Sequence, residues 1–234
     1  MITSKIWELL HLSVPPPKST QWTCEEFSTQ LESNLESCQW DVHPLHSVFT
    51  QYDRQYYLER RDAFIKKYRS FYVVSKTIAP RSIIELGTSA GSGADAYLSA
   101  TPSAKYTGID VFCDGTFSDG QTSWKPYDIA VRLLTDRKFK NWKLIKKDLR
   151  QMNKLPSKAD LVVVDAAHDV DSEYADLQLA LTARPTFIFV DDADAEKEAK
   201  PAIEKFLQED LHNQVEYTCP VSYIGGGLVI RLKV

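Results

Sequence analysis

The sequence lacks the excess of basic side chains that a nucleic-acid-binding protein needs. Its 28 Lys and Arg residues are outnumbered by 32 Asp and Glu residues, which leaves a formal net charge of −4. Binding to phosphate backbones requires clustered Lys and Arg. The one locally basic stretch, residues 138–147, reads as a solvated rim around a strand. We therefore expect no nucleic-acid partner.

The sequence also lacks paired cysteines and a long apolar run. Its four cysteines form no C-x-x-C pair and no zinc-ligand spacing, so reduced thiols in a cytoplasmic protein are the expected state. The apolar segment 6–14 is interrupted by Glu8 and His11. It is too short to span a bilayer and has no signal-peptide cleavage pattern. We expect a cytoplasmic protein with no membrane partner.

The N-terminal part of the chain contains helical patterns but no internal repeat. One helix is expected over residues 4–12, before three consecutive prolines. Thr23 and Glu26 have the spacing of a capping box, which predicts that a second helix begins there and runs to about Ser37. A third pattern covers about residues 51–77, with aromatic and aliphatic side chains at helical spacing that we expect to face the core.

From residue 82 onward, strand-like runs alternate with helical patterns. The strand-like runs are 82–86, 105–111, 142–146, 160–164, 186–190, 215–218 and 227–234. The helical patterns between and after them are 90–99, 126–135, a short one at 150–154, 172–182 and 195–208. This alternation predicts a mostly parallel sheet covered by helices on both faces. The linker 219–226 is too short for a parallel crossover, so the last two strands either pair antiparallel or lie apart.

A glycine-rich loop follows the first of these strands. An acid, Glu85, stands two residues before Gly87, and Gly91 and Gly93 complete the pattern G-x-x-x-G-x-G. Glycines let the chain turn sharply and approach a ligand closely. The spacing differs from the G-x-G-x-x-G of dinucleotide-binding proteins, and no P-loop lysine follows. Nicotinamide and nucleoside triphosphate cofactors are therefore disfavoured.

This segment resembles motif I of class I S-adenosylmethionine-dependent methyltransferases, E/D-x-G-x-x-x-G-x-G. The resemblance implies that the glycine loop, with Thr88, packs against the methionine part of the cofactor and that Glu85 lies near its amino group. Asp110 ends the second strand, where a carboxylate can accept both ribose hydroxyls, and Val111 follows it. Asp148, after the third strand, matches the family position that contacts the adenine amino group.

The same resemblance completes the fold prediction. We expect an α/β, Rossmann-like, seven-stranded, mostly parallel sheet with an antiparallel C-terminal edge and helices on both faces, plus an N-terminal helical extension. The extension is placed at residues 1–70 and the S-adenosylmethionine-binding catalytic domain at residues 71–234. In this family such an extension forms a lid or a dimer contact, so a homodimer is a family-level expectation.

Acidic side chains gather where the fourth and fifth predicted strands end. Asp165 follows the fourth strand, with His168 three residues later, and Asp191 and Asp192 follow the fifth. Adjacent strands lie about 4.8 Å apart, so these carboxylates can converge, and they would repel unless protonated or neutralised by a cation. A set of oxygen ligands suits Mg²⁺. The alternative is that the acids simply cap the strand and the following helix and hold no metal.

The arrangement resembles the divalent-metal-dependent O-methyltransferases of the catechol/caffeoyl-CoA and macrolide/aminocoumarin sugar types. By this resemblance Asp165, Asp191 and Asp192 hold Mg²⁺ or another divalent cation, and Asp165 also borders the cofactor. His168 would take the proton of the acceptor hydroxyl. The chain departs from these families at Ala167, where they usually have a second acid.

The leading hypothesis is transfer of a methyl group from S-adenosylmethionine to a hydroxyl of a small-molecule acceptor, a sugar or phenol of secondary metabolism. Metal assistance and His168 as base are part of it. One alternative is a metal-independent methyltransferase of the same fold acting on N, C or O. Another is a catalytically silent S-adenosylmethionine-binding protein. A nicotinamide-dependent dehydrogenase is the last contender, and the glycine spacing argues against it.

Overall fold

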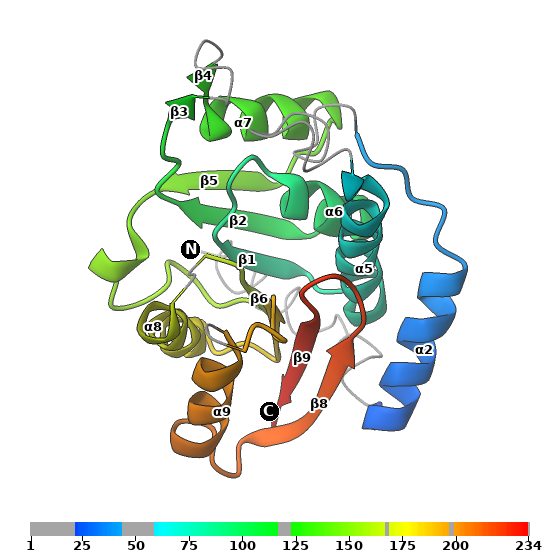
Figure 1. The fold of residues 1–234 in the computed structure, drawn as a ribbon, viewed down its shortest axis with the longest axis vertical. Helices are drawn as coiled ribbons and strands as arrows, with labels where there is room; N and C mark the ends of the chain where they lie inside the picture. The colour runs from blue at the N-terminus through cyan, green and yellow to red at the C-terminus, as the bar shows by residue number, and fades with distance from the viewer. Residues whose placement is uncertain (1–21, 44–58, 117–122, 167–168, 197–198, 234) are drawn as a thin grey trace, which may run out of the picture.

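A single mixed β-sheet forms the centre of the protein (Figure 1). The computed structural model describes residues 22–43, 59–116, 123–166, 169–196 and 199–233. Within them the main sheet has seven strands in the order β5-β2-β1-β6-β7-β9-β8. The strands are β1 Ser82–Leu86, β2 Lys105–Asp110, β5 Trp142–Lys146, β6 Leu161–Val164, β7 Phe187–Asp191, β8 Val215–Val221 and β9 Gly227–Leu232.

The strand directions confirm the predicted fold class. Strands β5, β2, β1, β6 and β7 are parallel, whereas β9 runs antiparallel to both β7 and β8. The short linker before β9 therefore makes an antiparallel pair, which is one of the two outcomes that its length allows. Every residue of β6 and β7 is buried, as expected for central parallel strands with continuous apolar sequences.

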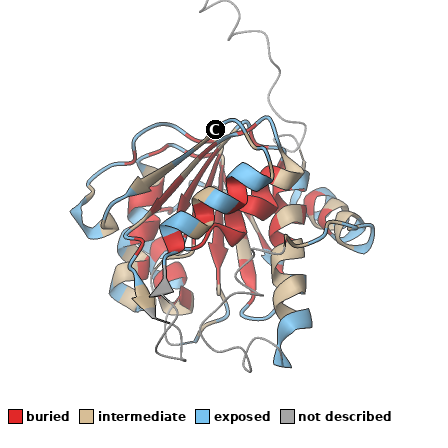
Figure 2. Cartoon of the chain, turned by 90° about the horizontal axis from the view of Figure 1, so that it is seen from above, coloured by how far each residue is buried: buried red, intermediate tan, exposed pale blue. Residues whose placement is uncertain are grey.

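Helices cover both faces of the sheet and build two cores (Figure 1). They are α2 Cys24–Glu36, α5 Arg61–Ile78, α6 Ser92–Ala100, α7 Pro126–Asp136, α8 Val170–Leu181 and α9 Ala199–Glu209. One core joins α2, α5 and α6 to the sheet, and the other joins α8 and α9 to its opposite face. Figure 2 shows the buried residues concentrated in the strands and on the inward sides of the helices. No helix in the described ranges has the length and apolar content needed to cross a membrane.

Two short regions differ from the sequence prediction. The helix expected at residues 150–154 is a 3₁₀ turn, Leu149–Gln151, which the side chain of Asp148 caps by accepting a hydrogen bond from the backbone of Arg150. After β2, β3 Gly115–Thr116 and β4 Ser123–Trp124 form an antiparallel pair that the sequence did not predict. The helix expected at residues 4–12 lies outside the described residues.

The described part of the N-terminal extension packs directly on the sheet. The predicted capping box is present, with Glu26 N–H donating to Thr23 Oγ1 and Thr23 N–H donating to the Glu26 carboxylate. Phe27 of α2 stacks against Phe187 of β7, with ring centroids 6.0 Å apart. The boundary predicted after residue 70 falls inside α5, so this helix belongs to both sides of the proposed division. The lid or dimer role of the extension stays a prediction.

A buried ion pair fixes α7 against α6. The Asp95 carboxylate is fully buried and receives two hydrogen bonds from Arg137, from Nε at 2.7 Å and from an Nη at 3.0 Å. The same guanidinium also donates to the carbonyl of Asp41 at 2.8 Å. Burial raises the pKa of Asp95, and the bonds from Arg137 oppose that rise. Arg137 thereby joins three segments through one buried charge.

Replacing Arg137 by Ala should therefore be strongly destabilising, because it leaves the buried Asp95 carboxylate without its partner. We expect Arg137→Ala to lower the free energy of unfolding by about 3–5 kcal/mol in urea denaturation. Arg132→Ala is the matched control. Arg132 is exposed and forms only a long surface pair with Asp136 on the same helix, so its loss should cost less than about 0.5 kcal/mol. Equal losses in the two variants would contradict this interpretation.

Candidate functional site

The glycine-rich loop turns tightly between β1 and α6. Gly87 has a φ of 90°, and a Cβ atom at this position would overlap the backbone carbonyl oxygen of Asp165. Gly91 is left-handed, with a φ of 82°, and is the N-cap of α6. A Cβ atom at Gly93 would overlap the Glu85 carboxylate. The loop can follow this path only because these positions carry no side chain.

Glu85 is a buried acid beneath this loop. Its side chain is 1% exposed and accepts a hydrogen bond from the hydroxyl of Tyr106 on β2. Burial raises the pKa of Glu85 to about 8, against the lowering effect of the Tyr106 hydrogen bond. At neutral pH this carboxyl group therefore retains its proton in much of the population.

Asp110, at the end of β2, ties the loop to the neighbouring strand. One carboxylate oxygen accepts a hydrogen bond from the Ser89 backbone N–H at 2.8 Å, and the other accepts one from Phe112 N–H at 2.5 Å. A carboxylate oxygen can accept more than one hydrogen bond. Asp110 can therefore hold the loop and still receive hydroxyl groups from a ligand.

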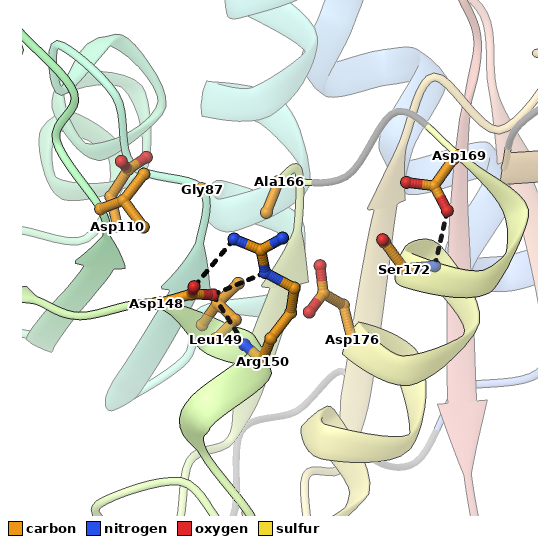
Figure 3. Close-up of a pocket in the computed structure, with 10 residues that line it drawn as sticks. Gly87, Asp110, Asp148, Leu149, Arg150, Ala166, Asp169, Ser172 and Asp176 are labelled. Carbon is orange, nitrogen blue, oxygen red and sulfur yellow. Dashed lines mark hydrogen bonds and ion pairs between the residues drawn. The ribbon is translucent and has the colours of Figure 1, made fainter.

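A cavity of about 270 Å³ opens beside Gly87 (Figure 3). It is lined by Gly87, Asp110, Val111, Asp148, Leu149, Arg150, Ala166, Asp169, Ser172 and Asp176. Asp148 is held by Arg150, whose Nε and Nη donate to its two oxygens at 2.9 and 2.8 Å, and these bonds lower the pKa of Asp148. Asp176 is 7% exposed, and burial raises its pKa to about 7.

A second, smaller cavity of about 40 Å³ also borders Gly87. It is lined by Tyr68, Glu85, Gly87, Thr88, Ser89, Ala90, Ser92, Gly93 and Asp165. Both cavities share Gly87, so one elongated ligand could contact the loop from the end of β2 to the start of α6.

The acids at the ends of β6 and β7 surround a lysine. Nζ of Lys67, on α5, is 2.5 Å from Asp191 Oδ2 and 3.6 Å from Asp192 Oδ1. Burial lowers the pKa of Lys67, but Asp165, Asp191 and Asp192 together raise it above its usual value. The other oxygen of Asp191 accepts a hydrogen bond from the Tyr223 hydroxyl at 2.7 Å. Burial, followed by the charge of Asp191, raises the pKa of Asp165.

Several solved structures share this architecture, although no family model and no curated protein sequence matches the chain. The methyltransferase PaMTH1 of Podospora anserina, solved with S-adenosylhomocysteine, is 14% identical, with a TM-score of 0.55 over 100% of this chain and 98% of that one. The O-methyltransferase TomG of Streptomyces achromogenes, in complex with S-adenosylmethionine, is 12% identical, with a TM-score of 0.51 over 100% of both chains. The O-methyltransferase of Bacillus cereus, in complex with S-adenosylhomocysteine, is 16% identical, with a TM-score of 0.50 over 98% and 97%.

The chain has the class I methyltransferase fold. The residues predicted to bind the cofactor gather around the glycine loop. Those that line at least one of the two cavities are Glu85, Gly87, Thr88, Gly93, Asp110, Val111, Asp148 and Asp165. Gly91 stands apart from both cavities, where it begins α6 and packs against Ala130 of α7. The contacts of all these residues with a ligand remain predictions.

The predicted metal ligands are arranged differently from a metal site. Asp191 and Asp192 do lie together, but around the ammonium group of Lys67. Within the described residues, no group of three or more His, Cys, Asp and Glu side chains is arranged to hold a metal ion. The residues present therefore do not fit the predicted Mg²⁺. His168, the predicted base, lies outside the described residues.

Asp176, which lines the larger cavity, was not predicted as a site residue. Lys67 was not predicted either. It is three residues after Phe64 and four before Phe71, a spacing that places the three on one side of a helix. The sequence predicts that this apolar side faces the core. A lysine within a core-facing stripe was therefore the available signal for a buried charge that needs an acidic partner.

Gly87→Ala should disrupt the loop, because it adds a Cβ atom against backbone at a positive φ. We expect a loss of at least about 2 kcal/mol in the free energy of unfolding, measured by urea denaturation. Gly226→Ala is the comparison, since its φ of 69° is also positive but its Cβ would meet the movable side chain of Asp194. The interpretation fails if Gly226→Ala is the more damaging change.

Glu85 should make stability depend on pH. The folded protein keeps this proton up to about pH 8, whereas the ordinary pKa is 4.5. The free energy of unfolding should therefore decrease as pH rises through this interval, by at most about 1.4 kcal/mol per pH unit. Glu85→Gln retains an acceptor for Tyr106 and should show a flatter profile in urea denaturation. Asp165 and Asp176 remain in both proteins, so parallel profiles would refute the assignment to Glu85.

Proposed function

We propose that the protein transfers a methyl group from S-adenosylmethionine to a hydroxyl of a small molecule. The observation that carries the proposal is the pair of adjoining cavities at the glycine loop, on the carboxyl side of the parallel strands. Ligands of open α/β sheets bind at this edge. The similar structures solved with S-adenosylmethionine or S-adenosylhomocysteine support the choice of cofactor.

The residues around the cavities fit the two ends of S-adenosylmethionine. The smaller cavity, with Glu85 and Thr88, suits the methionine end, and Gly87 allows the backbone to approach the ligand closely. The larger cavity suits adenosine, and Asp110, which lines it, is proposed to accept the ribose hydroxyls. When bound, the cofactor supplies an electrophilic methyl group on a positively charged sulfur.

The adenine amino group has two candidate acceptors in the larger cavity. Asp148 is the residue that the sequence indicates, but both of its oxygens already accept hydrogen bonds from Arg150. Asp176 lines the same cavity with a carboxyl group whose pKa burial raises to about 7. We propose that Asp148 and Asp176 together define the adenine end, with Arg150 fixing the position of Asp148.

The acceptor is proposed to be a small hydroxylated molecule, such as a sugar or a phenol. Two of the similar proteins are described as O-methyltransferases, and one of them takes part in tomaymycin synthesis, which favours a secondary metabolite. His168 follows β6 and is proposed to take the proton of the hydroxyl, since an unperturbed imidazole titrates near pH 6.5. Holding acceptor and methyl donor in line would supply much of the rate.

Divalent-metal assistance is the version of this function that the site supports least, because Lys67 lies where the cation was expected. Retention of methyl transfer in excess chelator would favour the metal-independent alternative. S-adenosylmethionine binding without turnover on a panel of phenols and sugars would favour the catalytically silent alternative. Cytoplasmic location and a homodimer stay predictions.

Calorimetric titration with S-adenosylhomocysteine tests the cofactor site. We expect one site per chain and a Kd at least about tenfold weaker in Asp110→Asn, because the substitution removes charge-assisted hydrogen bonds to the ribose. Asp114→Asn is the matched control. Asp114 is an exposed acid four residues after Asp110, in the segment that follows β2, and its substitution should leave Kd unchanged. Absence of binding in the wild-type protein would remove the proposed function.

A further inference from the structure

We propose that the ammonium group of Lys67 is a built-in cation that replaces a divalent metal at the ends of β6 and β7. The protein would then carry out its reaction without a metal. The statement about the reaction rests on the function proposed above. The replacement of a metal by Lys67 does not, because it can be tested by cation binding alone.

The distances around Lys67 leave no place for a second cation that bridges Asp191 and Asp192. Its Nζ is 2.5 Å from Asp191 Oδ2 and 3.6 Å from Asp192 Oδ1. Divalent cations bind carboxylate oxygens at about 2.0–2.6 Å, so an ion on these two residues would stand almost on the ammonium group. The two positive charges would repel each other strongly in a site with little water.

Asp191 is fixed on both sides. Its side chain is 1% exposed and that of Lys67 is 12% exposed. One oxygen of Asp191 faces Lys67, and the other accepts the hydrogen bond from Tyr223 at 2.7 Å. The orientation that binds the lysine is therefore stabilised by a second contact, and Asp191 is not free to turn toward another ion.

Packing along α5 holds Lys67 in place. Phe71, one turn further along the helix, packs edge-on against Phe189 of β7 and Tyr223, with centroids 5.3 and 5.7 Å away. Nζ of Lys67 lies 5.7 Å from the centroid of the Phe71 ring, within the range of a cation–π contact. Of the aromatic groups that anchor the helix, Phe71 thus also contacts the lysine and Tyr223 contacts its acidic partner.

This arrangement changes what the acceptor must offer. A metal ion can bind two neighbouring oxygens of a substrate and orient them together. An ammonium group that is already paired with Asp191 cannot chelate in this way. The acceptor therefore does not need two adjacent hydroxyl groups, and a molecule with one hydroxyl qualifies.

Titration of the full-length protein with Mn²⁺, followed by electron paramagnetic resonance of the free ion, tests the inference. We expect no bound Mn²⁺ in the wild type. Lys67→Met should bind one Mn²⁺ per chain, with a Kd at least about tenfold below the highest Mn²⁺ concentration at which the wild type shows no binding, because the carboxylates then lack the ammonium group. The double variant Lys67→Met/Asp191→Asn should lose this binding. Lys66→Met is the control, since Lys66 is the exposed neighbour on the same helix, and it should behave as the wild type.

Two results would overturn the inference. One is binding of a single Mn²⁺ by the wild type that Asp191→Asn abolishes. The other is a folded Lys67→Met protein that gains no Mn²⁺ binding. Lys67→Gln, which keeps a hydrogen-bond donor, serves where Lys67→Met does not fold, and the wild-type titration decides by itself if neither does. S-adenosylhomocysteine binding, measured on the same samples, reports separately on the proposed function.

Discussion

Repulsion between carboxyl groups at one edge of the sheet is the constraint on which the rest of the structure depends. Parallel strands bring their carboxyl ends together, and here β1, β2, β6 and β7 each end in or beside an acid. Charges so close and so poorly hydrated must be protonated, hydrogen-bonded or paired. The acids of β1, β2 and β7 each use a different one of these solutions, and each solution fixes a neighbouring segment.

Three solutions to this repulsion are present: hydrogen bonds from backbone donors, a retained proton, and pairing with a lysine. Asp110 accepts hydrogen bonds from two backbone N–H groups and so holds the glycine loop. Glu85 is buried under the same loop, where its raised pKa and the Tyr106 hydrogen bond keep it compatible with an apolar setting. Asp191 binds Lys67 and Tyr223. Three carboxyl groups thus acquire different partners and different roles from their surroundings.

The sequence predicted what depends on local pattern. The strand 142–146 and the capping box of α2 were predicted correctly, because a short strand-like run and the Thr–Glu spacing are properties of neighbouring residues. The residues around the glycine loop also follow from a local motif and its strand. Element ends were less accurate, as for the helix expected from residue 195, since α9 begins at Ala199.

Pairings between distant segments could not be read in the same way. Lys67 and Asp191 meet only because α5 docks beside β7, and neither segment has a sequence pattern that indicates the other as its partner. The sequence indicated that the acids needed a cation, which was correct. It indicated Mg²⁺ because the predicted ligands are all oxygen atoms and resemble those of the metal-dependent O-methyltransferases. Asp148 is paired with a residue close to it in the sequence, Arg150, but the sequence did not predict this pair either. Because Arg150 donates to both carboxylate oxygens of Asp148, the pair changes what Asp148 can offer to a ligand in the cavity.

Lys67 lies within residues 1–70, the predicted N-terminal extension, so the extension contributes a charge to the site. A metal ion is exchangeable and can be absent while the fold persists, whereas Lys67 arrives only when α5 packs on the sheet. Before α5 docks, the acids at the ends of β6 and β7 lack their counter-charge, and the apolar contacts of Phe71 are also missing. The same helix–sheet contact therefore supplies both the ammonium group beside Asp191 and the aromatic packing of Phe71. The acids at the ends of β6 and β7 have their lysine partner only in a chain whose α5 is packed on the sheet.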